Sequence, residues 1–278
     1  MKNLLLILII ASISTISYSQ NPRLVFSNKN LATYKQATTM VMLKENNRYH
    51  TILKRVIEKN WTFNKYEFTT EEKLKTKYKE KSPLPILGFI EGYSDYVGTN
   101  ESSRTLGIQS IGFATMFKSK KYYNMENKEV VHAFSLNNIE DLKTEKSIEA
   151  FFTVIIQDLN NYLIVLGNPD NKVHSRKSYW NYTKRKDIKS FKNKKILLSK
   201  KDSWNEKFML DEEAAKKYNY QFVSEERITE AILNNEDVLI YYSDNWGHIN
   251  WAKNGELIED IIRSKQNIMF KEFRERQN

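Results

Sequence analysis

The chain has 278 residues, of which 40% are apolar, 13% aromatic and 28% charged, and its 44 lysines and arginines against 34 aspartates and glutamates give a formal net charge of +10. An apolar fraction of this size excludes a disordered chain. The absence of cysteine excludes disulfides, cysteine-bound metals and a thiol nucleophile. The length suits one large domain or two small ones.

Residues 1–20 have the pattern of a secretory signal peptide. Lys2 supplies the positive charge, residues 4–11 are apolar without a break, and Ser17 and Ser19 are the small residues before a cleavage site at Gln20. The apolar run is shorter than the roughly 20 residues that a membrane-spanning helix needs. We therefore expect removal of residues 1–19 and an exported protein, periplasmic or secreted, with no later membrane span. The high content of Lys, Asn, Ile and Tyr favours a bacterial source.

Residues 20–110 are predicted to form a first βαβαβ half. Its expected elements are, in chain order, a strand at 39–43, a helix with an apolar stripe at 47–60, a strand from Tyr66, a helix capped by Thr70 and a strand at 86–90. This order favours parallel strands with helices packed on the sheet.

Residues 111–170 have a different pattern. Residues 111–117 and 129–134 alternate in hydropathy, which predicts an antiparallel pair of strands. Residues 144–166 predict one long helix, which is apolar nearly all round in its second half and is ended by Gly167 and Pro169. Such a helix is usually buried, so we expect it to be a central strut between the two halves.

Residues 171–193 are predicted to be a basic connector, and residues 194–278 a second βαβαβ half. The expected elements of this half are a strand at 195–198, a helix at 210–218, a helix capped by Ser224, a strand at 238–242, a hairpin turn at Asn254–Gly255 and a charged helix at 258–276.

A short repeat links the two halves. Residues 66–74 read YEFTTEEKL, and residues 220–228 read YQFVSEERI. The order strand, helix, strand, helix, strand is the same around both copies, so local and longer-range patterns agree. We therefore predict an α/β fold of two repeated βαβαβ units with a mostly parallel sheet, a central antiparallel pair and a long buried helix. Whether the halves are separate lobes or share one sheet is left open.

The segment from Trp61 to Phe68 and its echo at residues 220–222 are the basis for a resemblance to a group of proteins. In these blocks the chain resembles uncharacterised exported bacterial α/β proteins with two related half-domains. The resemblance implies a two-half α/β fold. It implies no activity, cofactor or site residue.

Several known kinds of site are excluded or disfavoured. Residues 107–112 have the glycine spacing of a phosphate-binding loop, but Phe113 and Ala114 stand where Lys and Ser or Thr should follow. We therefore expect no nucleotide site. The four histidines are far apart in sequence, so no metal site and no cofactor are predicted. His132 is expected in the core, whereas His50, at the border of a helical stripe, is expected at the surface.

Three acids form one candidate constellation. Glu91 and Asp95 follow the strand at 86–90, and Asp244 follows the corresponding strand of the second half. If the halves pack about a pseudo-twofold axis, these carboxylates converge beside the glycine-containing loop at 92–107 and could perform acid–base catalysis. The alternative is that acids at strand ends simply face water.

The basic segment, residues 172–201, carries the surplus charge of the chain. It holds twelve cations against one acid, Asp187, for a net charge of +11, whereas the rest of the chain has a net charge of −1. Aromatic residues lie among these cations, as in sites that bind anionic polymers. The candidate anion-binding residues are Arg176, Lys177, Lys184, Arg185, Lys186 and Lys189. The alternative is a solvated linker rich in lysine.

Three functions are open at this point. The first is an exported, non-enzymatic binding or scaffolding protein of the cell envelope, with another envelope protein or an anionic polymer as partner. The second is a polyanion-binding protein that uses the basic segment. The third is a hydrolase built on Glu91, Asp95 and Asp244.

Overall fold

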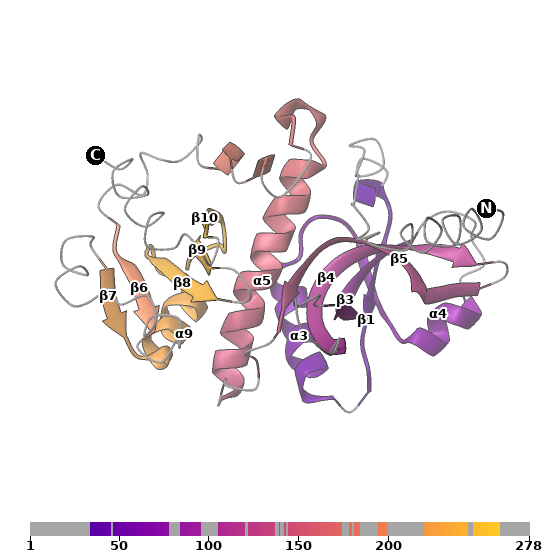
Figure 1. Ribbon diagram of the computed structural model, residues 1–278, viewed down its shortest axis with the longest axis horizontal. Helices are drawn as coiled ribbons and strands as arrows, with labels where there is room; N and C mark the ends of the chain where they lie inside the picture. The colour runs from indigo at the N-terminus through magenta and orange to yellow at the C-terminus, as the bar shows by residue number, and fades with distance from the viewer. Residues whose placement is uncertain are drawn as a thin grey trace, which may run out of the picture.

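The computed structural model describes residues 34–45, 47–77, 84–95, 105–119, 122–136, 139, 142, 144–173, 178–179, 181–183, 194–199, 220–243 and 247–261. These residues form two mixed five-stranded sheets on either side of one long helix (Figure 1). An α/β fold is therefore present, and the two halves build separate sheets rather than one. The expected signal peptide, residues 1–19, lies outside the described residues.

The first sheet has the strand order β2-β1-β3-β4-β5. Its elements are β1 (Thr39–Met42), α3 (Arg48–Asn60), β2 (Tyr66–Thr69), α4 (Glu71–Lys77), β3 (Leu84–Asp95), β4 (Thr105–Ser119) and β5 (Tyr122–Ser135). β1 pairs in parallel with β2 and β3, whereas β4 pairs antiparallel with β3 and β5. The expected antiparallel pair is present, but it belongs to the same sheet as the first three strands.

The second sheet has the order β10-β9-β8-β6-β7. Its elements are β6 (Ile196–Ser199), β7 (Tyr220–Val223), α9 (Glu225–Leu233), β8 (Leu239–Ser243), β9 (Gly247–Trp251) and β10 (Leu257–Ile261). β6 pairs in parallel with β7 and β8, and the other neighbours are antiparallel. The helix expected at 210–218 lies outside the described residues.

The expectation of a mostly parallel sheet is wrong, because each sheet contains two parallel and two antiparallel pairings. The physical reason is the length of the connections. Parallel neighbours need a crossover of about a dozen residues or more, usually with a helix. Only residues 96–104 separate β3 from β4, and only residues 120–121 separate β4 from β5, so these strands turn back on themselves.

Two local expectations are also corrected. Gly92 and Gly107 were expected in an irregular loop, but they lie in β3 and β4, where they pair with Ile108 and Tyr93. Residues 258–261 were expected to start a helix, but they continue β10 after the hairpin turn at Asn254 and Gly255. In both places, pairing with a neighbouring strand outweighs the local preference of the sequence.

The long helix α5 (Glu145–Leu166) is the centre of the fold. It begins where the Thr144 hydroxyl accepts a hydrogen bond from the Ser147 N–H, and it ends at Gly167, as expected from the sequence. α5 packs against α3 of the first lobe and α9 of the second. We use first lobe for β1–β5 with α3 and α4, and second lobe for β6–β10 with α9.

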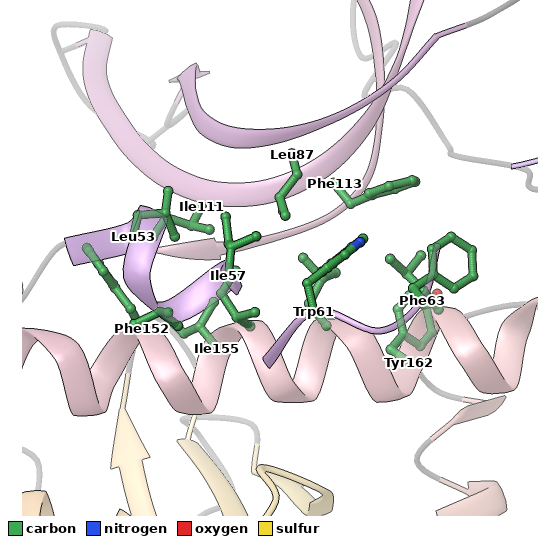
Figure 2. Close-up of a cluster of buried hydrophobic side chains, with 14 of the residues drawn as sticks. Leu53, Ile57, Trp61, Phe63, Leu87, Ile111, Phe113, Phe152, Ile155 and Tyr162 are labelled. Atoms are coloured by element: carbon green, nitrogen blue, oxygen red, sulfur yellow. The ribbon is translucent and has the colours of Figure 1, made fainter. Parts of the chain in front are cut away.

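The two sides of α5 carry different apolar side chains. Phe152, Ile155 and Tyr162 join α3, β3 and β4 in the larger buried cluster (Figure 2). Ala150 and Val154 join the smaller cluster with β6, α9 and β8. Among the described helices, α5 alone has the length and hydropathy of a membrane span. No membrane span was expected after the first 20 residues. In the structure, 67% of the most apolar stretch of α5 is buried inside the fold.

Polar side chains of α5 form hydrogen bonds with loops of both lobes. The buried Asn160 accepts hydrogen bonds from the N–H groups of Thr62 and Phe63, both at 2.8 Å, and thereby fixes the turn between α3 and β2. Its neighbour Asn161, on the more exposed side, donates to the carbonyl of Asn254 in the hairpin of the second lobe at 3.0 Å. The helix therefore holds one lobe through a buried amide and the other through an exposed one.

Asn160→Leu tests the buried contact. We expect it to lower the free energy of unfolding by about 2–4 kcal/mol, because the buried N–H of Phe63 and the partly buried N–H of Thr62 lose their acceptor. The matched control is Asn161→Leu on the same helix, which should cost less than about 1 kcal/mol because its bond is exposed. Urea denaturation of both variants checks this, and equal losses would contradict the assignment of Asn160 as the buried anchor.

Gly255→Ala tests the docking of the hairpin on α5. Gly255 has a φ of +64°, and an added Cβ would lie 2.5 Å from the Cβ of Gln157. We expect a loss of more than about 2 kcal/mol, of which about 1–2 kcal/mol comes from the left-handed backbone. In a Gln157→Gly background the contact with the Gln157 side chain is removed and only the 3.1 Å approach to the Val154 carbonyl oxygen remains, so a double-mutant cycle by urea denaturation should show coupling. Strict additivity would mean that the hairpin does not lie against α5.

Candidate functional site

The carboxyl end of β1 is the point where the first sheet changes direction. β1 connects through α3 to β2 on one side and pairs with β3 on the other. In α/β proteins this position, outside the ends of two strands whose connections diverge, is where ligands usually bind. We call it the β1 edge and define it by residues 42–45 and 47–50 with Gly88 and Phe89.

Gly88 lets β3 pass close to the end of β1. It pairs with Met42, has a φ of +155° and would place an added Cβ 2.9 Å from the Met42 carbonyl oxygen. That distance is shorter than a carbon and an oxygen tolerate without displacement. A glycine is therefore required here for close pairing of the two strands.

His50 lies in the first turn of α3, directly at the β1 edge. The side chain of Asn47 caps this turn by accepting from the N–H groups of Tyr49 and His50 at 2.9 and 3.2 Å. The imidazole Nδ1 accepts from the Lys44 N–H at 3.0 Å, and the ring centroid lies 4.4 Å from that of Phe89. His50 is only 6% exposed.

The expected surface position of His50 is therefore wrong. The loop between β1 and α3 folds back over the ring, and β3 covers its other side. Burial, reinforced by the charge of Lys44, lowers the pKa of His50 to about 4, although a hydrogen bond with the Met42 backbone acts in the opposite direction. At neutral pH the ring is uncharged, so it supplies hydrogen bonds at this edge and no positive charge for an anion.

The three candidate acids are not brought together by anything in the described part of the chain. Glu91 and Asp95 lie on β3, where they pair with Gln109 and Thr105. Four residues along a strand separate their Cα atoms by about 13 Å. Asp244 lies outside the described residues, so the three-acid site stays a prediction. In the described ranges, no group of three His, Cys, Asp or Glu residues could hold a metal ion.

The packing of α5 also bears on the pseudo-twofold axis that this prediction assumed. α3 connects the first and second strands of its lobe, whereas α9 connects the second and third. α5 therefore contacts the helix that follows the first strand of one lobe and the helix that follows the second strand of the other, so its two contacts are not made by helices in matching positions of the chain order.

The six candidate anion-binding residues of the basic segment, Arg176, Lys177, Lys184, Arg185, Lys186 and Lys189, all lie outside the described residues. Neighbouring residues within the segment are described, and they are anchored. Val173, Tyr179 and Thr183 are each 1% exposed. Tyr179 packs edge-on against Tyr162 of α5, with 5.2 Å between ring centroids. Tyr179 is thus part of the core, so it cannot stack on a ligand as the sequence suggested.

The other end of the basic segment is fixed to the second lobe. The Lys194 ammonium donates to the carboxylate of Asp237, which Lys253 also contacts at 2.8 Å. Lys194 and Lys253 hold the pKa of Asp237 below its ordinary value, and both ammonium groups lie over the ring of Trp251. Among the described residues of the segment, Lys194 is therefore paired, and residues near both ends of the segment contact the rest of the fold.

No protein family, curated protein or solved structure matches this chain. The function of the chain is therefore inferred from its charge distribution and from the residues described above.

Tyr179→Ala tests the anchoring of the basic segment. We expect a loss of about 3–5 kcal/mol in the free energy of unfolding, as for the truncation of other large buried aromatic side chains. Asn181→Ala, two residues away and exposed, should change stability by less than about 0.5 kcal/mol. Thermal and urea denaturation measure both variants. Indistinguishable stabilities would return the segment to the status of a solvated linker.

Proposed function

We propose that this chain is an exported, non-enzymatic binding or scaffolding protein of the bacterial cell envelope. The signal-peptide pattern of residues 1–19 supports export. The shared core supports a scaffold, because Leu257 of the second lobe belongs to the same buried cluster as Leu53 and Phe152. Two lobes joined through one core keep a fixed relative position, which suits the presentation of a surface to a partner.

We also propose that the lobes are copies of one unit. Both sheets have the same strand order, with β1 to β5 corresponding to β6 to β10. The repeated motif falls at the same register, since Tyr66 pairs with Thr39 on β1 and Tyr220 pairs with Ile196 on β6. In both copies the hydroxyl of the capping residue, Thr70 or Ser224, accepts the N–H three residues later. A duplicated frame provides two similar supports for the segment that joins them.

Polyanions are the ligand class that we propose for this protein. The main support for this proposal is the charge distribution: residues 172–201 have a net charge of +11, whereas the rest of the chain has a net charge of −1. A solvated linker does not need buried anchors, yet Val173 and Tyr179 lie in the large buried cluster, Thr183 is buried, and Lys194 contacts Asp237 of the second lobe. Cations on an anchored segment lose little conformational entropy when a ligand binds. Acidic envelope polymers and anionic headgroups both suit such a site.

Binding of the mature protein, from Gln20 onward, to heparin, single-stranded nucleic acid and anionic vesicles across salt concentrations tests this proposal. We expect the affinity to fall steeply with salt, because each neutralised phosphate or sulfate releases counterions. The variant Lys184/Arg185/Lys186→Ser should bind more weakly and should lower the slope of log K against log salt by up to about 2–3.

The matched control is Lys118/Lys120/Lys121→Ser, which also removes three cations within four residues but lies at the β4–β5 turn. It should leave the salt slope nearly unchanged. Equal effects of the two variants would show attraction by net charge alone, and an absence of binding at low salt would remove the polyanion proposal.

A further inference from the structure

The loop between β1 and α3, described at residues 43–45 and 47, is held in place by a small set of hydrogen bonds. The Leu43 N–H donates to the Thr69 carbonyl at 2.9 Å and so extends the pairing of β1 with β2. The next N–H, that of Lys44, donates to the Nδ1 of His50 at 3.0 Å. The imidazole therefore ties the loop to the first turn of the helix that follows it.

Protonation of the imidazole removes this tie. A neutral histidine has one ring nitrogen that accepts a hydrogen bond, whereas an imidazolium carries a hydrogen on both nitrogens and accepts none. In the protonated state the Nδ1–H would face the Lys44 N–H, donor against donor. Either the ring or the loop must then move.

The surroundings of His50 provide little compensation for a positive charge. The loop contributes the cation Lys44, and Phe89 of β3 faces the ring with an apolar surface. Arg48 and Glu45 are exposed. On α5 the acids Glu145 and Glu149 lie 3.8 and 3.2 Å from the Arg55 guanidinium, and on β3 the acidic position next in sequence is Glu91, two residues beyond Phe89.

The loop is the part that can move at least cost. The apolar stripe of α3, which includes Ile52, Leu53, Val56 and Ile57, lies in the core, whereas Lys44 and Glu45 are exposed. Movement of residues 43–45 away from α3 brings the ring into water without disturbing that stripe. Segments with few buried apolar contacts are those that open locally while the fold persists.

We propose that His50 is an acid-sensitive latch that holds residues 43–45 against the first turn of α3, and that protonation of its imidazole releases these residues while both lobes stay folded. The latch acts at the position where α/β proteins usually bind ligands, so it makes the shape of this edge depend on pH. The proposal does not depend on the basic segment or on the polyanion hypothesis.

The direction and size of the effect follow from proton linkage. The pKa of His50 is about 4 in the closed state, and it returns to its ordinary value of 6.5 in water when the loop opens. The free energy that favours the closed state is therefore fully present above pH 6.5 and decreases as the pH falls toward 4. Between pH 7 and pH 5 the population of the open loop should rise about 20-fold.

Amide hydrogen exchange of the ¹⁵N-labelled mature protein, read by NMR, tests the latch. The reporter is the Lys44 N–H, and its exchange rate is corrected for the intrinsic dependence on pH. We expect its protection to fall about 20-fold between pH 7 and pH 5, while amides of α5 such as Ile155 keep theirs. A direct titration of the His50 ring in the same sample should give a pKa well below 6.5.

Two variants separate the latch from general acid sensitivity. His50→Asn keeps an acceptor near the Nδ1 position but does not titrate, so protection of Lys44 should become independent of pH. His50→Phe lacks the acceptor, so Lys44 should be unprotected at both pH values. The proposal is overturned if Lys44 is unprotected at pH 7, if its protection does not change in the unmodified protein, or if Ile155 loses protection in parallel. A His50 pKa near 6.5 overturns it even where the variants fail to fold.

Discussion

The burial of α5 is the constraint on which the rest of the structure depends. A helix that is apolar nearly all round cannot be covered by one sheet, because one sheet faces only one side of it. Phe152, Ile155 and Tyr162 lie against the first lobe, and Ala150 and Val154 lie against the second. Neither lobe can leave without exposing a continuous apolar surface to water, so the two lobes form one structural unit.

The few polar groups on α5 give this apolar packing its register. An apolar surface tolerates sliding, whereas a buried amide with two fixed donors does not. Asn160 meets the backbone of Thr62 and Phe63, and Gln157 donates to Asn60 at the end of α3. The connection after α5 continues this role, because Tyr179 returns to the same helix before the chain enters the second sheet. The described part of the basic segment around Tyr179 is thus attached to the central helix.

Features with a local cause could be predicted from the sequence. Thr144 and Gly167 mark the ends of α5, the alternating pattern of residues 111–134 indicates two adjacent strands, and the Asn254–Gly255 pair indicates a hairpin. The environment of His50 could not be predicted in this way. Its neighbour Phe89 comes from a strand 39 residues later, and the sequence shows only that His50 follows a capping asparagine. The antiparallel pairing of β3 with β4 was missed because residues 92–107 were expected to form a loop.

The ends of α5, the hairpin turn at Asn254 and Gly255, the apolar character of α5 and the concentration of charge in residues 172–201 can be read from the sequence, because each depends on residues close together in the chain. The division into two sheets, the contacts of α5 with α3 and α9, and the burial of His50 and Tyr179 are visible only in the folded protein. These properties arise from contacts between distant segments, such as the bond between Asn160 and Thr62, which are 98 residues apart. Apolar surface specifies that such a contact must form, but the three-dimensional fit of the elements selects the partner.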